Sequence, residues 1–122
     1  LNAINNVEFA RLAAEEVTQA LNGTREFRRL KSLSTPIADY DLQTVLVDPP
    51  RAGLDSATLS LVGEFDQILY ISCNPMTLLD NLSHIAESHD IISLAFFDQF
   101  PYTDHLECGV NLRRRGHHEA TE

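Results

Sequence analysis

The sequence predicts an α/β fold with a mostly parallel sheet and an antiparallel final strand. Short runs rich in Val, Ile and Leu alternate with segments of helical periodicity, as in strands joined by crossover helices. The last two predicted strands, residues 91–97 and 107–112, are instead separated by a loop without helical character. We therefore expect the final strand to run against its neighbour.

The first 33 residues are predicted to contain a strand and a helix. Residues 7–12 alternate in hydrophobicity as a short strand does, and residues 13–21 repeat apolar side chains at helical spacing. The pair Asn22-Gly23 is typical of a helix end. The basic residues 24–33 that follow could form a further helical stretch.

The middle of the chain is predicted to hold two buried strands and a helix between them. Residues 44–47 and 68–71 are short apolar runs, which favours strands that are buried on both faces. Residues 56–62 have helical periodicity, and the helix is expected to begin after Asp55 or Ser56 as the N-cap.

A longer amphipathic helix is predicted over residues 76–88. The dipeptide Asn74-Pro75 breaks the preceding strand, and an apolar stripe follows it. The stripe consists of Leu78, Leu79, Leu82, Ile85 and Ala86.

Composition narrows the class of protein. The net charge of −9 argues against this chain alone gripping a phosphate backbone. Two cysteines do not make a disulfide framework, so a reducing cytoplasm is the expected location. The sequence has no apolar run long enough for a transmembrane helix and no Cys/His spacing typical of a zinc site, so we expect neither a membrane nor a metal as partner.

Polar clusters lie near the carboxyl ends of three predicted strands. Asp48-Pro49-Pro50-Arg51 follows residues 44–47, Ser72-Cys73-Asn74-Pro75 follows residues 68–71, and His105-Leu106-Glu107-Cys108-Gly109 follows the loop after the strand over residues 91–97. An open α/β sheet builds its active site at the carboxyl ends of its parallel strands. In such a site a cysteine thiolate can attack a substrate while a carboxylate accepts a proton.

Each of these side chains also has a purely structural interpretation. Cys73 could be a small buried hydrophobe, and Cys108, inside a predicted strand, is expected to serve packing. Glu107 could be a solvated carboxylate. Asp48 could cap a turn, and Arg51 could pair with Asp48.

Three segments carry a resemblance to a known family. Residues 47–54, 70–75 and 97–110 resemble the bacterial RNA uracil-5-methyltransferases, above all those that modify tRNA. The resemblance extends over residues 1–112 and implies the C-terminal part of a class I, Rossmann-like, S-adenosylmethionine-dependent methyltransferase domain. Residues 113–122 are then expected to be a disordered tail. The Gly-rich cofactor loop of such domains is missing from the sequence, so we expect a fragment that is inactive alone.

The resemblance also implies a role for each candidate residue. Cys73 would be the nucleophile that adds to carbon 6 of a uridine in the tRNA T-loop, and Glu107 would be the base that removes the proton from carbon 5. Asp48 would bind the cofactor, S-adenosyl-L-methionine. The residues expected to contact the uridine are Arg51, Phe100 and His105.

Other functions remain open on the sequence alone. An rRNA uracil-5-methyltransferase would share the cysteine and glutamate motifs. A cysteine-dependent hydrolase would need a histidine beside Cys73, for which His105 is the candidate, but it would leave Asp48-Pro49-Pro50-Arg51 without a role. An amino-methylating DNA methyltransferase would carry an aromatic residue in place of Arg51, and the isolated chain could also be only a binding domain.

Overall fold

The computed structural model describes residues 6–99 and 101–116, and the chain divides into two compact units, Leu1–Asp41 and Leu42–Glu122. The first unit contains helix α1, Ala14–Leu21, and two short 3₁₀ turns at Arg28–Leu30 and Ile37–Asp39. The second unit contains the sheet. None of the helices in the described part of the chain is long and apolar enough to span a membrane.

In the first unit, the predicted helix over residues 13–21 is confirmed, because α1 covers Ala14–Leu21. The Glu16 side chain caps the start of α1 by accepting a hydrogen bond from the backbone N–H of Ala13 at 2.9 Å. The helix ends at Leu21 with Asn22 as its C-cap, and Gly23 follows with a φ of 71°, as the predicted helix end requires.

Two expectations for this unit are wrong. Residues 7–12 do not form a strand, because they have no partner strand; side chains hold them instead, with Glu8 accepting from the N–H and hydroxyl of Ser34. Residues 24–33 form only the single 3₁₀ turn Arg28–Leu30. Arg29 stabilises the packing by donating to the Arg11 carbonyl and to Glu16, both at 2.7 Å.

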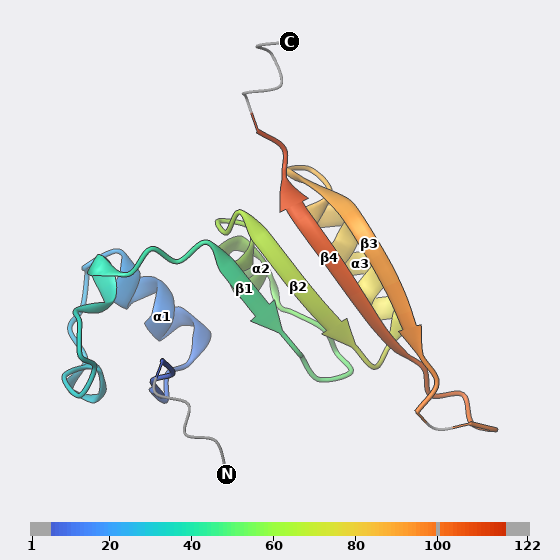
Figure 1. The fold of residues 1–122 in the computed structure, drawn as a ribbon, viewed down its shortest axis with the longest axis horizontal. Coiled ribbons are helices and arrows are strands. Elements are labelled where there is room, and N and C mark those ends of the chain that lie inside the picture. The colour runs from blue at the N-terminus through green and yellow to red at the C-terminus, as the bar shows by residue number, and fades with distance from the viewer. Residues whose placement is uncertain (1–5, 100, 117–122) are drawn as a thin grey trace. The chain divides into compact units, whose positions relative to one another are not determined.

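The second unit is a four-stranded sheet in the order β1-β2-β4-β3 (Figure 1). Strand β1, Thr44–Val47, pairs in parallel with β2, Gln67–Ser72. Strand β4, Glu107–Arg114, lies antiparallel between β2 and β3, His89–Phe97. Three strands therefore run one way and the last runs against them, which confirms the predicted mostly parallel sheet with an antiparallel final strand.

Both helices of the second unit cover the same face of the sheet, behind the strands in Figure 1. They are α2, Ser56–Val62, and α3, Pro75–Ile85. The predicted helix over residues 56–62 and its Asp55 N-cap are confirmed, since the Asp55 carboxylate accepts from the Thr58 N–H at 2.8 Å.

The core lies between these helices and the sheet. Alternate residues of β2 and β4 point into it, together with apolar residues of the helices. Its fully buried members are Val62, Ile68, Tyr70, Leu78, Ile85, Cys108, Val110 and Leu112. The alternation also corrects the expectation that β1 is buried on both faces, because Leu46, on the face away from the helices, is 60% exposed.

The end of the sheet extends further than the sequence indicates. Strand β4 was expected to stop at Leu112, yet it continues through Arg113 and Arg114 into the predicted tail, because Arg113 pairs with Gln67 and Arg114 with His89. Helix α3 is shorter than predicted and gives way after Ile85 to the turn that starts β3. Residues 117–122 of the predicted tail lie outside the described residues.

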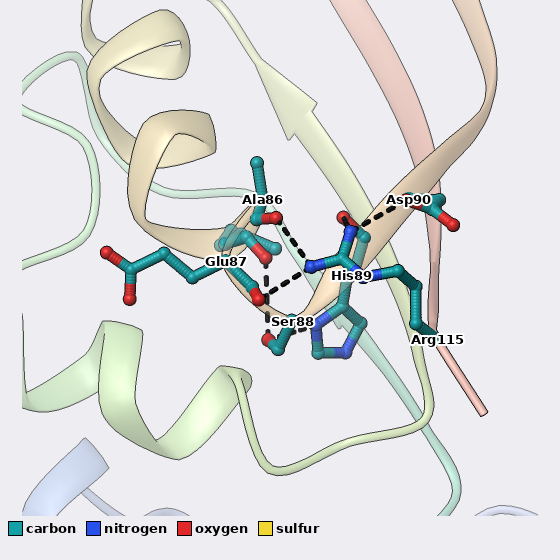
Figure 2. A network of polar contacts seen from close by, with 7 residues as sticks. Ala86, Glu87, Ser88, His89, Asp90 and Arg115 are labelled. Atoms are coloured by element: carbon teal, nitrogen blue, oxygen red, sulfur yellow. Dashed lines mark hydrogen bonds and ion pairs between the residues drawn. The ribbon is translucent and has the colours of Figure 1, made fainter. Parts of the chain in front are cut away.

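Arg115, just beyond β4, joins the end of α3 to the start of β3 (Figure 2). Its guanidinium donates to the carbonyls of Ala86 at 3.0 Å and Glu87 at 2.6 Å, and to the Asp90 carboxylate at 2.7 Å. The helix-end carbonyls have no partner within the helix, so these contacts satisfy them. Next to Arg115, the buried His89 bridges the Ser88 hydroxyl and the Phe65 carbonyl.

We expect Arg115→Ala to lower the free energy of unfolding by about 1–2 kcal/mol, because the helix-end carbonyls lose a charged donor. The measurement is the urea midpoint followed by circular dichroism. Arg113→Ala is the matched control: it removes the same charge from an exposed position of β4 and should change stability by less than about 0.5 kcal/mol. Equal losses for the two variants would contradict a specific role for Arg115.

Candidate active site

A pocket of about 370 Å³ lies at the carboxyl edge of β2 and is lined by Arg51, Cys73, His105, Leu106 and Glu107. Four of these five are residues that the sequence analysis singled out. They come from three separate segments of the chain: the loop after β1, the turn after β2 and the start of β4. The structure therefore brings together polar clusters that the sequence places far apart.

The pairing of β2 with β4 sets the relation between the cysteine and the glutamate. The antiparallel register ends with Ser72 paired with Cys108, so Cys73 follows the last paired residue of β2 and Glu107 precedes the paired Cys108 of β4. Ser72 and Cys108 are both buried. Their neighbours Cys73 and Glu107 instead line the pocket together.

The turn that carries Cys73 is tightly held by its neighbours. The Ser72 hydroxyl accepts from the Asn74 N–H at 3.0 Å and donates to the Asn74 carbonyl at 2.9 Å. The Asn74 side chain then caps α3 by accepting from the Met76 N–H at 3.1 Å, and Pro75 occupies the first turn of the helix. The partly exposed Cys73 thus lies on a rigid strand-to-helix turn.

Cys108 confirms its predicted packing role. It is 1% exposed, in the core beneath the sheet. Burial, with a smaller contribution from the Glu107 carboxylate, raises the pKa of its thiol. Since the thiolate is the reactive form, Cys108 is poorly suited to nucleophilic chemistry.

Arg51 is positioned by its backbone and faces His105 with its side chain. The Arg51 carbonyl accepts hydrogen bonds from the Asn74 amide at 3.0 Å and from the Thr77 hydroxyl at 2.9 Å. Its guanidinium Nη1 lies 3.5 Å from Nδ1 of His105, the outer limit of a hydrogen bond. Within residues 6–99 and 101–116, Arg51 makes no ion pair with Asp48, so that alternative is wrong.

Asp48 is not among the residues that line the pocket. Asp48 follows β1 at the same edge of the sheet and is exposed, and the N-cap of α2 is Asp55 rather than Asp48. Phe100 lies outside the described residues. The described residues contain no group of three His, Cys, Asp or Glu side chains arranged to hold a metal ion.

One residue at this edge escaped the sequence analysis. Asn81 lies on the buried face of α3 between Leu78 and Ile85, and it is 3% exposed. The sequence pattern could have identified it. Position 81 is three residues after Leu78 and four before Ile85, so it lies on the apolar face of the predicted helix, yet it holds a polar asparagine. A buried amide must find hydrogen-bond partners, so such a position points to a structural contact.

Comparison with known proteins gives consistent matches over nearly the whole chain. The model of the tRNA (Uracil-5-)-methyltransferase family matches residues 1–115. A tRNA/tmRNA (uracil-C(5))-methyltransferase of Cellvibrio japonicus is 57% identical over 115 residues, and one of Erwinia tasmaniensis is 54% identical over 115 residues. Each match covers 94% of this chain, but the chain spans only 31% of the length of each relative.

A solved structure shares the fold. It is the Pyrococcus abyssi tRNA (uracil-54, C5)-methyltransferase in complex with S-adenosyl-L-homocysteine, with 35% identity and a TM-score of 0.52. The similarity covers 57% of this chain and 18% of that protein.

The two cysteines should differ sharply in reactivity towards iodoacetamide. We expect Cys73 to be alkylated on the order of tenfold faster than Cys108, because Cys108 is buried and its thiol has a raised pKa. Mass spectrometry of proteolytic peptides measures both rates in the same sample. Cys108→Ser is the control and should leave the Cys73 rate unchanged; equal rates in the unaltered chain would refute the assignment.

Proposed function

The chain belongs to the tRNA (uracil-5-)-methyltransferase family, and on that premise we propose that it supplies the nucleophile and the base of an enzyme that methylates carbon 5 of a uridine in the tRNA T-loop. The observation that carries the proposal is the pocket that joins Cys73 and Glu107 with Arg51 and His105. The names of the relatives support a tRNA substrate, and the archaeal neighbour is named for uracil 54.

The reaction needs covalent activation because carbon 5 of uracil is a weak nucleophile. In our proposal the Cys73 thiolate adds to carbon 6, forming an S–C bond and pushing the electrons of the ring double bond towards the carbonyl at carbon 4. Carbon 5 thereby becomes nucleophilic enough to take up a methyl group. Glu107 then removes the proton from carbon 5, the double bond re-forms, and the Cys73 thiolate leaves.

Arg51 suits the charge that develops in the first step. Addition at carbon 6 places negative charge on the carbonyl oxygen at carbon 4, and a guanidinium in the pocket can donate hydrogen bonds to that oxygen. An arginine only donates, so in a hydrogen bond between these two side chains Nδ1 of His105 would be the acceptor. We propose that both side chains contact the uracil, and Phe100 remains a proposed stacking residue.

Asp48 is our candidate for holding the cofactor. It is an exposed carboxylate at the carboxyl end of β1, and Pro49-Pro50 restricts the backbone that follows it. The amino, hydroxyl and amine donors of S-adenosyl-L-methionine fit such an acceptor, and the archaeal neighbour binds its demethylated form. When bound, the cofactor supplies an electrophilic methyl group.

A cysteine hydrolase is the weaker candidate. It would require an imidazole paired with the Cys73 thiol. Here the His105 ring contacts the Arg51 guanidinium. The family match also favours methyl transfer over hydrolysis.

In the intact enzyme that contains this chain, Cys73→Ala should reduce methylation of tRNA by about 10⁴-fold or more, because carbon 5 then loses its covalent activation. Transfer of a radiolabelled methyl group to tRNA lacking the modification is the measurement. Cys108→Ala, which also removes a thiol, should retain most of the activity. Turnover by Cys73→Ala near the level of the unaltered enzyme would exclude the covalent mechanism.

Glu107→Gln should trap the methylated RNA on the protein. Without a base the carbon 5 proton stays, and the S–C bond at carbon 6 cannot be eliminated. A band of RNA-linked protein on a denaturing gel is expected, and the double variant with Cys73→Ala should lack it. If Glu107→Gln turns over normally with no linked species, Glu107 is not the base.

A further inference from the structure

Three polar residues hold the segment that carries Arg51: Asn74, the N-cap of α3, and Thr77 and Asn81 within the helix. We propose that Asn81 is a positioning residue for the candidate active site: it fixes the backbone of residues 51–54 against α3 so that Arg51 is presented to the pocket. The inference shares one assumption with the proposed function, namely that this pocket is the catalytic site.

Both ends of the Asn81 side-chain amide make hydrogen bonds to other parts of the chain, the loop before α2 and strand β2. Its Oδ1 accepts from the Leu54 N–H at 2.9 Å and from the Tyr70 hydroxyl at 2.6 Å, while its Nδ2 donates to the Leu54 carbonyl at 3.3 Å. The amide therefore pairs with both backbone groups of Leu54, as a neighbouring strand would. Buried donors and acceptors are costly to leave unpaired, so this set of bonds selects one conformation of the segment.

Gly53 allows the 51–54 segment to approach α3 closely. Its φ is +78°, in the region that favours glycine, and its N–H donates to the Pro50 carbonyl at 2.8 Å. A Cβ at this position would lie 2.9 Å from Oδ1 of Asn81 and 3.2 Å from Cβ of Thr77. The close approach of the segment to α3 therefore depends on a residue without a side chain.

The same helix fixes both ends of the short stretch from Arg51 to Leu54. At its start, the Arg51 carbonyl accepts from Asn74 and Thr77. At its end, Leu54 is held by Asn81. Asn74 also adjoins Cys73, so the guanidinium and the thiol are positioned from one rigid element.

Tyr70 makes the Asn81 contact specific. Its ring is fully buried in β2, and burial, with a smaller effect from Cys73, raises the pKa of its hydroxyl. The hydroxyl therefore stays protonated and donates to Oδ1, which orients the amide with Nδ2 towards the Leu54 carbonyl. An apolar residue at position 81 could fill the space but could not hold Leu54.

The first test compares Asn81→Ala with Leu78→Ala in the intact enzyme. Both residues are buried on the same face of α3, but the Leu78 side chain is apolar and cannot hydrogen-bond to the 51–54 segment. At a temperature where both variants are folded, we expect kcat to fall about 100-fold in Asn81→Ala and far less in Leu78→Ala. Values for the two variants within about threefold of each other would overturn the proposal.

A pH profile provides a readout that a packing role would not move. In Asn81→Asp the introduced carboxyl group, when protonated, can still donate to the Leu54 carbonyl; when ionised, it sets an oxygen against that carbonyl. Burial disfavours the ionised form, so activity relative to the unaltered enzyme should rise as the pH falls through the pKa of that group. The same ratio for Asn81→Ala should stay flat, and a flat ratio for Asn81→Asp would overturn the proposal.

The other titratable groups near position 81 are the same in the unaltered enzyme, in Asn81→Asp and in Asn81→Ala. They are Tyr70 on β2 and, in the groove of about 470 Å³ between α2 and α3 that Asn81 also lines, Asp80, His84 and Glu87. Taking the ratio to the unaltered enzyme at each pH removes their contribution.

A third readout separates this proposal from the proposed function. Hydrogen exchange of the Leu54 amide, measured by NMR in the chain itself, should become at least about tenfold faster in Asn81→Ala and change little in Leu78→Ala. If the intact enzyme methylates no RNA, the proposed function fails, while faster exchange in Asn81→Ala alone still supports the positioning. Unchanged exchange of the Leu54 amide in Asn81→Ala overturns it.

Discussion

The antiparallel register between β2 and β4 is the constraint on which the candidate site depends. It pairs the buried Ser72 with the buried Cys108, and the residues next to this pair, Cys73 and Glu107, line the pocket. A slip of one residue would turn Cys108 outward and Glu107 into the apolar core, because side chains alternate along a strand. Burial of one charged carboxylate would be costly enough to forbid that register. The hydrophobic pattern of β4 therefore determines both which of its residues enter the core and which residue lies at the candidate site.

Helix α3 supports this arrangement from the other side. At its start, Asn74 and Thr77 hold the Arg51 carbonyl, and further along Asn81 holds Leu54. At its end, Arg115 satisfies the last carbonyls and links the helix to the sheet (Figure 2). A short helix is marginal in isolation, so these polar contacts at both ends complement its packing on the core.

The elements with strong local signals were predicted well. The strand over residues 44–47 and the helix over residues 56–62 coincide with β1 and α2, since proline, an N-cap and apolar periodicity mark their ends directly. The predictions for residues 7–12 and 24–33 were wrong, because a strand needs a partner and a basic stretch needs a surface to pack on. The conformation of both stretches is set instead by side chains distant in sequence, such as Glu8 with Ser34 and Arg29 with Arg11.

By itself the sequence determined the α/β class, the direction of the final strand, the family and the candidate residues of the site, because these follow from local periodicity and from short motifs. Only the tertiary structure decided that Arg51, Cys73, His105 and Glu107 share one pocket, that Asp48 stands outside its lining, and that Asn81 holds Leu54. These relations depend on strand order and register and on helix packing. Such contacts join residues tens of positions apart, and no local pattern in the chain encodes the distance between them.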